Sequence, residues 1–227
     1  MFLFVTVPNN SASTMIMRIL GTSPNVSYLS KEIWFDRPNP PNTGSIDFEG
    51  KDVRLADWSD YVANYMPKSE PRVFSENADA YCSENYNWEM IKKFWFKAWD
   101  MSKPVQIEKT PDNVYKAQDI AKQFPNAKFI ISTREAEGFC ASMKKYGYPV
   151  KRSYQHWLAC QKKQEENAAV LGDRCHVTTY EQICADPQKF INDLLKFVPE
   201  LDSLKIPEFI ENLSEPCYEL KVMRNET

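Results

Sequence analysis

The sequence predicts an α/β fold in which a central parallel sheet is flanked by helices, and three observations favour it. The chain begins with an apolar strand over residues 2–7 (FLFVTV), which passes through a short loop into a helical stretch over 13–20. The segment 104–147 then alternates strand and helix twice, which is typical of a parallel sheet covered by helices. A composition of 43% hydrophobic and 26% charged residues is ordinary for a folded globular chain.

The region from about 36 to 105 differs in composition from the rest of the chain. It contains a Pro-rich loop, many aromatic residues and mixed charge, and we predict that it is an insertion on the acceptor side of a single domain spanning residues 1–227. Within it, NWEMIKKFWFKAWDMS predicts a helix. One face of that helix carries Trp88, Ile91, Trp95 and Trp99.

The elements that follow are predicted in order along the chain. A short strand ends near Glu108, a turn at 110–112 leads into a helix to Gln123, and a strand covers 128–133. A helix follows Arg134, and another runs from Tyr154 to about Leu171. The last elements are a strand, HVTTYEQI, and a helix, PQKFINDLLKFV.

Composition narrows the classes of function. A net charge of −3 gives no broad basic field for a nucleic acid. Six scattered cysteines without a CxxC pair, together with two histidines, signal neither a metal site nor a disulfide framework. The opening apolar run is too short for a secretory leader, and no apolar run is long enough to span a membrane. We therefore expect a soluble, cytoplasmic protein, with its oligomeric state left open.

The loop VPNNSAST, between the first strand and the first helix, is a candidate anion site. Ser11, Ser13 and Thr14 offer hydroxyl donors, and the helix N-terminus beside them favours a negative charge. The alternative is that Ser13 simply caps the helix. The loop contains neither Gly nor Lys or Arg, and the Walker A pattern is absent.

A second candidate anion site involves Arg134 and Ser142. Arg134 falls at the carboxyl end of a predicted strand, where open α/β sheets bind ligands, and Ser142 follows on the next helix. A guanidinium and a hydroxyl suit a phosphate, although an arginine at a strand end is also a common surface ion-pair partner. Two such sites suggest a nucleotide with two separated phosphates.

Three segments together resemble the PAPS-dependent sulfotransferase family, nearest in motif style to its bacterial-type and protein-tyrosine members. They are NSASTMIMRILGTSPNVSYLSKE, EKTPDNVYKAQDIAKQFPNAKFIISTREAEGFCASM and VTTYEQICADPQKFINDLLKFV. The resemblance implies a sheet architecture like that of P-loop NTPases. It also implies transfer of a sulfuryl group from 3′-phosphoadenosine-5′-phosphosulfate (PAPS), without a metal, to leave 3′,5′-adenosine bisphosphate.

The resemblance assigns the loop from Asn10 to Thr14 to the 5′-phosphosulfate, with Ser11 and Ser13 among its ligands, and Arg134 with Ser142 to the 3′-phosphate. Asn10 stands where the family usually has a basic residue, and Ala12 where it often has Gly. The first change removes a charged hydrogen bond, which is worth about 1.5–3 kcal/mol. The second makes a positive φ angle harder to adopt.

The same resemblance suggests catalytic roles for Glu32 and Lys109. Glu32 falls where several family members place the general base, and Lys109 would stabilise charge on the leaving oxygen. Both could instead be exposed residues without a role. Tyr180 is expected near the nucleotide, while His156 is a less favoured base. Lys221 and Arg224 could close over the 3′-phosphate, or belong to a solvated tail.

Three functions follow from these residues. The first is sulfuryl transfer to a hydroxyl or amine of a small-molecule, sugar or peptide acceptor. The second is a nucleotide-binding or interaction protein with the same fold and impaired chemistry, which Asn10 and Ala12 favour. The weakest is a small-molecule kinase, against which the missing Walker lysine argues. The aromatic residues between Trp34 and Trp99 are the expected wall of the acceptor pocket, although most of these rings could instead belong to the core.

Overall fold

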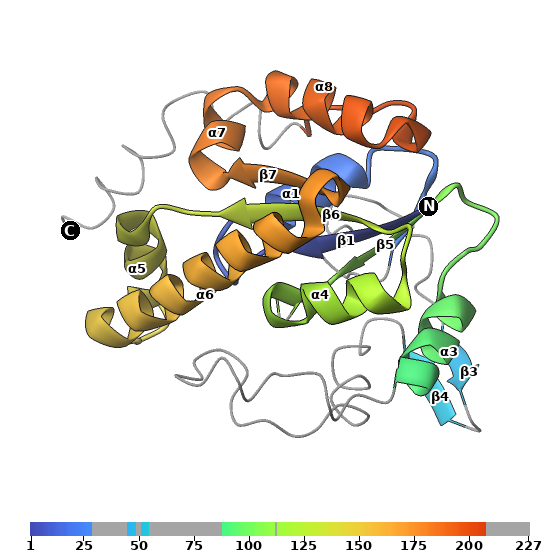
Figure 1. The fold of residues 1–227 in the computed structure, drawn as a ribbon, viewed down its shortest axis with the longest axis horizontal. Coiled ribbons are helices and arrows are strands. Elements are labelled where there is room, and N and C mark those ends of the chain that lie inside the picture. Colours follow the sequence, from blue (N-terminus) through green and yellow to red (C-terminus); the bar gives the residue numbers. More distant parts are fainter. Residues whose placement is uncertain (29–44, 49–50, 55–87, 112, 208–227) are drawn as a thin grey trace.

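Five parallel strands form the central sheet of the computed structural model, in the spatial order β2-β5-β1-β6-β7 (Figure 1). Residues 1–28, 45–48, 51–54, 88–111 and 113–207 are described. The strands of this sheet are β1 (Phe2–Thr6), β2 (Val26–Tyr28), β5 (Val105–Lys109), β6 (Lys128–Thr133) and β7 (Cys175–Thr179). A separate antiparallel pair is formed by β3 (Ser45–Phe48) and β4 (Lys51–Arg54).

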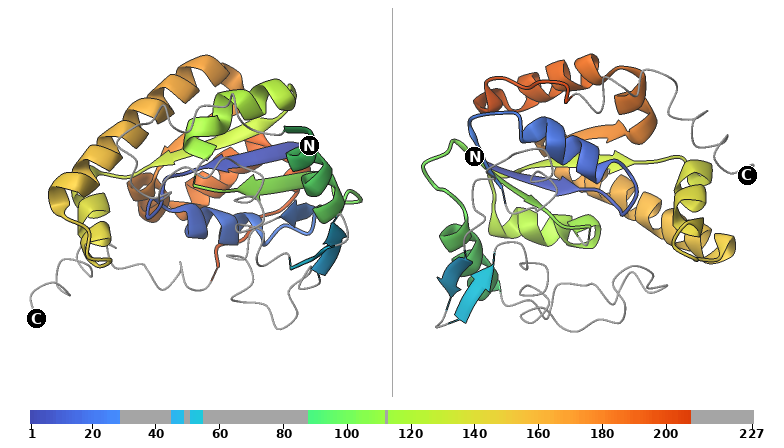
Figure 2. Two further views of the ribbon diagram at one scale, coloured as in Figure 1. Left: turned by 90° about the horizontal axis from the view of Figure 1, so that it is seen from below. Right: turned by 180° about the vertical axis from the view of Figure 1, so that it is seen from behind.

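Helices cover both faces of the sheet, which lies between them when the molecule is seen from below (Figure 2, left). One face carries α1 (Ser13–Leu20), α7 (Tyr180–Ala185) and α8 (Pro187–Phe197). The other carries α3 (Trp88–Ala98), α4 (Asn113–Gln123) and α6 (Val150–Leu171). Helix α5 (Ala136–Lys144) follows β6 and packs against α6.

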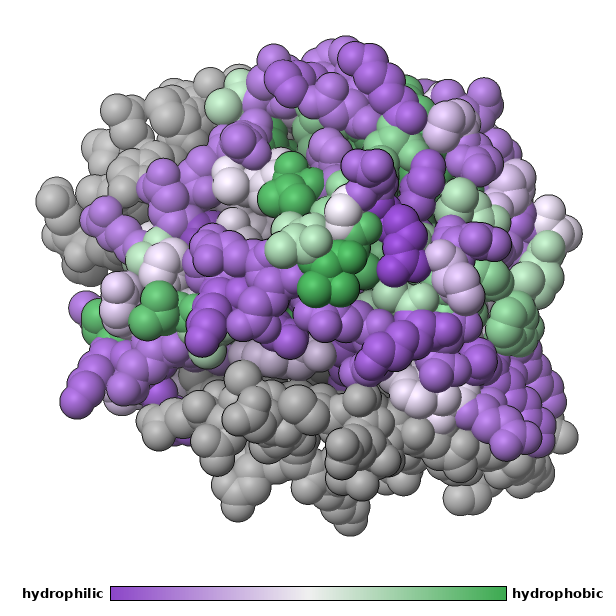
Figure 3. Space-filling view, in the orientation of Figure 1, coloured by the Kyte–Doolittle hydropathy of each residue, from purple (hydrophilic) through white to green (hydrophobic). Residues whose placement is uncertain are grey.

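The two faces have separate hydrophobic cores, because successive side chains of a strand point to opposite sides. Leu3 and Val5 of β1 join the core beneath α1 and α8, whereas Phe4, between them, joins the core beneath α3 and α4. The outer surface over α4, α6 and α8 is mostly hydrophilic (Figure 3), as amphipathic helices on a buried sheet require.

Most of the predicted elements are confirmed within one or two residues, but three boundaries were wrong. The helix predicted over 87–102 ends at Ala98. The predicted strand HVTTYEQI ends at Thr179, and Tyr180 begins α7. The reason is a capping box in which Thr179 and Gln182 satisfy each other's backbone N–H groups, which starts a helix there. The third wrong boundary is the start of α6, at Val150 rather than Tyr154.

The predicted insertion, 36–105, is described at β3, β4, α3 and its last residues; the remainder lies outside the described residues. The helix predicted within it is confirmed as α3, and Ile91, Trp95 and Trp99 are all buried, as expected for one face.

The connections that leave β1 and β6 run toward opposite edge strands of the sheet. After β1 the chain passes through α1 to β2, on the β5 side, whereas after β6 it passes through α5 and α6 to β7. Open α/β sheets bind ligands where neighbouring connections diverge in this way. The carboxyl ends of β1 and β6 are therefore the expected binding position, and both predicted anion sites follow these two strands.

Candidate functional site

The loop between β1 and α1 has an unusual backbone. Asn10 has φ of 60° and Ala12 has φ of 80°, so two residues other than glycine adopt the left-handed conformation. This conformation costs an ordinary residue about 1–2 kcal/mol. Left-handed residues separated by one of ordinary φ turn successive backbone N–H groups toward a common point, as in anion-binding nests. Ala12 thus adopts the conformation for which the family often uses Gly.

Helix α1 begins without a capping side chain. Its N-cap residue is Ala12, Ser13 is its first helical residue, and its first turn contains no acidic side chain. The alternative in which Ser13 caps the helix is therefore wrong. Uncapped N–H groups at a helix N-terminus are free to donate to an anion, and the helix dipole favours its charge.

Contacts with neighbouring strands and with α6 fix the loop in place. Ser11 is buried, and its carbonyl oxygen accepts a hydrogen bond of 3.3 Å from Ser132 Oγ on β6. Gln164 of α6 donates its amide to the carbonyl of Thr6, the last residue of β1. Sequence reasoning missed Ser132 and Gln164. The buried positions Cys160, Gln164 and Asn167, spaced as one helical face, are the signal that a polar stripe of α6 faces inward.

The side chains of the loop point in different directions. Ser13 is buried beside the start of α1, whereas Thr14 is exposed. The amide of Asn10 donates to Met143 Sδ of α5 over 2.9 Å. This contact holds the amide against α5, although sulfur is a weak acceptor.

Arg134 lies directly after β6 and is only 7% exposed. Its Nη1 donates to the carbonyl oxygen of Asn10 over 3.0 Å, and its guanidinium lies 4.2 Å from the centre of the Tyr180 ring. Trp157 Nε1 donates to the Arg134 carbonyl over 2.6 Å. No carboxylate of the described chain pairs with Arg134, so the surface ion-pair alternative is wrong.

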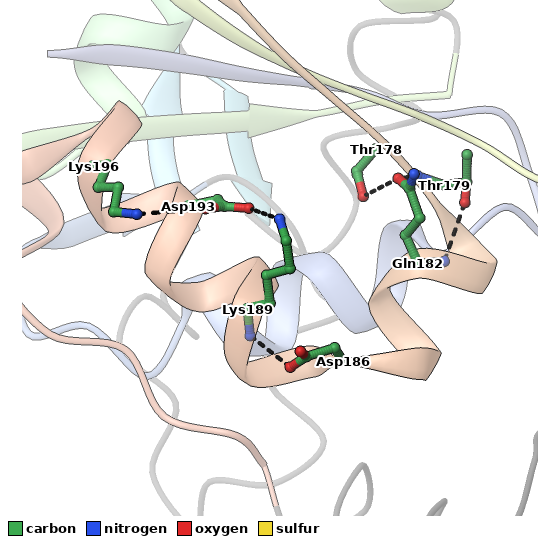
Figure 4. Close-up of polar contacts among 7 residues, drawn as sticks. All are labelled: Thr178, Thr179, Gln182, Asp186, Lys189, Asp193 and Lys196. Atoms are coloured by element: carbon green, nitrogen blue, oxygen red, sulfur yellow. Dashed lines mark hydrogen bonds and ion pairs between the residues drawn. The ribbon is translucent and has the colours of Figure 1, made fainter.

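Tyr180 owes its position to the turn from β7 into α7. Thr179 Oγ1 accepts from the Gln182 N–H over 3.1 Å, and Gln182 Oε1 accepts from the Thr179 N–H over 3.1 Å (Figure 4). Asp186 then caps α8 by accepting from the Lys189 N–H. The structure thus brings Tyr180 to Arg134. Ser142 lies half-buried on α5 and makes no side-chain hydrogen bond within the described residues.

Two charged residues that are adjacent in the sequence, Glu108 and Lys109, are buried at the carboxyl end of β5. Glu108 accepts from Thr110 Oγ1 and from Asn113 Nδ2, both over 2.5 Å. Burial raises the pKa of Glu108, which the two hydrogen bonds and the charges of Lys116 and Lys109 oppose. Lys109 is opposite Val5 of β1 in the register, so it lies at the same sheet edge as the loop. Sequence reasoning missed Glu108, which shapes the turn after Lys109.

His156 lies on α6, where burial lowers its pKa to about 4. Its Nε2 is 3.6 Å from Cys160 Sγ, and Cys160 Sγ is 3.3 Å from the hydroxyl of Tyr115. The imidazole is thus neutral at pH 7 and packed inside the protein, close to the ring of Phe139.

The loop, Arg134 and α6 share one pocket. It is lined by Pro8, Ser11, Thr133, Arg134, Phe139, Trp157, Cys160 and Gln161. The sequence predicted that the loop and Arg134 belong to one site, and the structure brings these two together. Three further predicted residues, Glu32, Lys221 and Arg224, lie outside the described residues, as do the aromatic residues between 55 and 87.

Metal and membrane features are absent from the described ranges. Among those residues, no three His, Cys, Asp or Glu side chains are grouped closely enough to hold a metal ion. None of the described helices is long and apolar enough to cross a bilayer.

The chain is similar to known proteins in sequence and in fold. The model of a family described as "Sulfotransferase family" matches residues 3–201. A sulfotransferase from Alicyclobacillus acidocaldarius superposes with a TM-score of 0.52 at 13% identity, covering 99% of this chain and 93% of that one. Sulfotransferase STF1 from Mycobacterium tuberculosis H37Rv has a TM-score of 0.47 at 14% identity, covering 94% of this chain and 75% of that one. No curated protein matches the chain.

Proposed function

The chain belongs to the sulfotransferase family, and we propose that it transfers a sulfuryl group from PAPS to a hydroxyl or amine acceptor. The observation that carries this proposal is the loop between β1 and α1. It combines two left-handed residues, an uncapped helix N-terminus and, at its edge, a buried guanidinium that pairs with no carboxylate of the described residues. These features fit a dianionic phosphosulfate better than a neutral ligand.

In the proposed reaction the donor supplies an activated sulfuryl group, and the chain positions and neutralises its charge. The N–H groups of the loop and of α1, with the hydroxyls of Ser11, Ser13 and Thr14, would hold the 5′ end. Arg134 and Ser142 would hold the 3′-phosphate. Lys109 would lie at the sheet edge where charge develops on the leaving oxygen, and such preorganised cations contribute strongly to transfer reactions.

Removal of the acceptor proton is assigned to Glu32 in this proposal. A positioned general base contributes about 10²–10⁴-fold to a rate. The low pKa of His156, about 4, and its burial against Cys160 make it a poor alternative base at pH 7. The proposed acceptors are small molecules, sugars or peptides. The aromatic residues between Trp34 and the start of α3 are the proposed wall of their pocket, because Trp95 and Trp99 are buried in the core.

The first experiment is calorimetric titration of the folded protein with 3′,5′-adenosine bisphosphate. Arg134→Ala should weaken binding by about tenfold or more, because a charged hydrogen bond is worth about 1.5–3 kcal/mol. Glu32→Gln should bind the bisphosphate as the native protein does, but transfer ³⁵S-labelled sulfate from PAPS more slowly. A folded native protein that does not bind the bisphosphate contradicts the proposal.

A second candidate function is nucleotide binding without transfer, and Asn10 is the observation that favours it. Its amide carries no charge and is engaged by Met143. Under this alternative the bisphosphate binds, no acceptor in a broad panel is sulfated, and Asn10→Lys creates activity. Transfer by the native protein to any acceptor of the panel excludes it.

A further inference from the structure

We infer that Arg134 supplies the positive charge missing from the loop between β1 and α1, so that it serves the 5′-phosphosulfate as well as the 3′-phosphate. This inference rests on the proposed function and goes beyond it, because the resemblance to sulfotransferases gives Arg134 a role only at the 3′ end of the nucleotide. The new role follows from the position of the guanidinium in this chain.

The loop itself contains no cation. From Pro8 to Thr14 its sequence is PNNSAST, and the family's basic position is occupied by Asn10. The Asn10 amide does not replace the missing charge, since its Nδ2 donates to Met143 Sδ over 2.9 Å. Charge for a phosphosulfate held by this loop therefore has to come from another element.

Arg134 is the cation that touches the loop. Its Nη1 donates over 3.0 Å to the carbonyl oxygen of Asn10, the residue at the position where the charge is missing. Arg134 also lines the same pocket as Pro8 and Ser11. The guanidinium is thus attached to the 5′ loop before any nucleotide is considered.

The charge of Arg134 has no counter-ion in the described part of the chain. Glu181, on α7, directs its Oε1 to the backbone N–H of Glu135 over 3.2 Å and forms no ion pair with Arg134. The Nε–H of Arg134 is buried and donates to no partner among the described residues. Burying an uncompensated charge is costly, and buried charges in proteins are normally paired. A bound anion would balance this charge, and the loop that Nη1 contacts is the anion site proposed above.

The surroundings hold the guanidinium in this position. The centre of the Tyr180 ring lies 4.2 Å away on one side, a cation–π contact that holds the planar guanidinium against the start of α7. On another side is Gly138 of α5, where an added Cβ would lie 2.9 Å from Nε. A side chain at position 138 would therefore force the guanidinium to shift from this position.

Ligands that carry only one of the two anionic groups distinguish the role of Arg134 at the 5′-phosphosulfate from its role at the 3′-phosphate. Adenosine 5′-phosphosulfate lacks the 3′-phosphate, and 3′-AMP lacks the 5′ group. We expect Arg134→Gln to weaken binding of adenosine 5′-phosphosulfate by about 10- to 150-fold, the loss of one charged hydrogen bond. Ser142→Ala, the matched control at the 3′ end, should weaken 3′-AMP and leave adenosine 5′-phosphosulfate bound as before.

Returning a charge to the loop provides the decisive variant. Asn10→Arg in the Arg134→Gln background should restore the affinity for adenosine 5′-phosphosulfate and leave that for 3′-AMP weak. Unchanged affinity of Arg134→Gln for adenosine 5′-phosphosulfate overturns the inference, and so does the absence of rescue. If the native protein binds 3′,5′-adenosine bisphosphate but not adenosine 5′-phosphosulfate, the inference fails while the proposed function survives. If it binds neither, both fail.

Gly138→Ala tests the same point if Arg134→Gln does not fold. It retains the charge of Arg134 and places a methyl group against Nε. Alanine is the better helix former, so a weaker α5 cannot explain lost affinity. We expect about a tenfold loss for adenosine 5′-phosphosulfate, the lower end of a charged hydrogen bond. Binding equal to that of the native protein overturns the inference.

Discussion

Replacing Ala12 with glycine should stabilise this protein, although Ala→Gly substitutions normally destabilise. Ala12 has φ of 80° and ψ of 1°, which costs a residue with a Cβ about 1–2 kcal/mol and costs glycine nothing. Against this gain, glycine increases the freedom of the unfolded chain, at about 0.4–1 kcal/mol. The partly buried methyl group of Ala12 contributes less than about 0.8 kcal/mol.

A matched control cancels the contribution of the unfolded chain to the free energy of unfolding. Ala169 is exposed on α6, where the backbone is helical, and Ala169→Gly should cost about 1 kcal/mol. Both substitutions change the unfolded chain in the same way, so their difference reports the left-handed strain. We expect Ala12→Gly to be more stable than Ala169→Gly by about 1–2 kcal/mol.

Urea denaturation followed by circular dichroism measures this difference. The midpoints of the two variants should separate while the slopes of their transitions stay equal, which shows that stability alone has changed. If Ala12→Gly lowers the midpoint as much as Ala169→Gly does, the left-handed conformation of Ala12 is refuted, and with it the nest-like loop on which the proposed anion site depends.

Three further predictions concern the elements that hold the site. Thr179→Ala removes the capping box of α7 and should cost about 1 kcal/mol, or about 2–4 °C in Tm; an unchanged Tm would mean that the cap is not formed. Gln164→Leu leaves the buried Thr6 carbonyl without its donor and should cost about 1–3 kcal/mol by urea denaturation, which a nearly neutral result would contradict. Burial lowers the pKa of His156 to about 4, so the unfolded chain, with its ordinary value near 6.5, binds the proton first and stability falls as pH drops between these values, by up to about 3 kcal/mol. His156→Gln should reduce that fall between pH 7 and 4.5, and an unaltered pH dependence would count against the burial of a neutral imidazole.

Local patterns were enough to predict four of the five strands of the central sheet, but not the short edge strand β2. The strands β1 and β6 are short apolar runs that alternate with helical segments, and each is buried on both faces. Such strands are easy to recognise in a sequence, because burial of both faces requires a continuous run of apolar residues. The strand predicted over HVTTYEQI was too long for the opposite reason. The hydrophobic pattern alone does not reveal a capping box, because the box is formed by two hydrogen bonds between Thr179 and Gln182.

The sequence was enough to predict residues of the candidate site, but not the contacts that these residues make. Sequence spacing identified the loop and Arg134, because each follows a strand at the binding edge of the sheet. It could not show that Arg134 donates to the Asn10 carbonyl, since the two residues are 124 positions apart. Nor could it identify Gln164, 158 positions from the Thr6 carbonyl it binds. Both contacts depend on how α6 and β6 pack around β1, which no local pattern encodes.

The departures from the family pattern at positions 10 and 12 therefore have different physical consequences. Ala12 keeps the backbone shape that glycine would give, so the change costs stability and leaves the N–H groups of the loop available. Asn10 keeps the shape as well, with φ of 60°, but removes the charge. Under our inference, shape and charge are supplied by different elements: the loop would provide the backbone donors, and Arg134, directly after β6, would provide the cation. If the loop binds an anion in this way, binding depends on α5 and α7 holding Arg134 in place, so substitutions at Gly138 or Tyr180 should impair it without touching the loop.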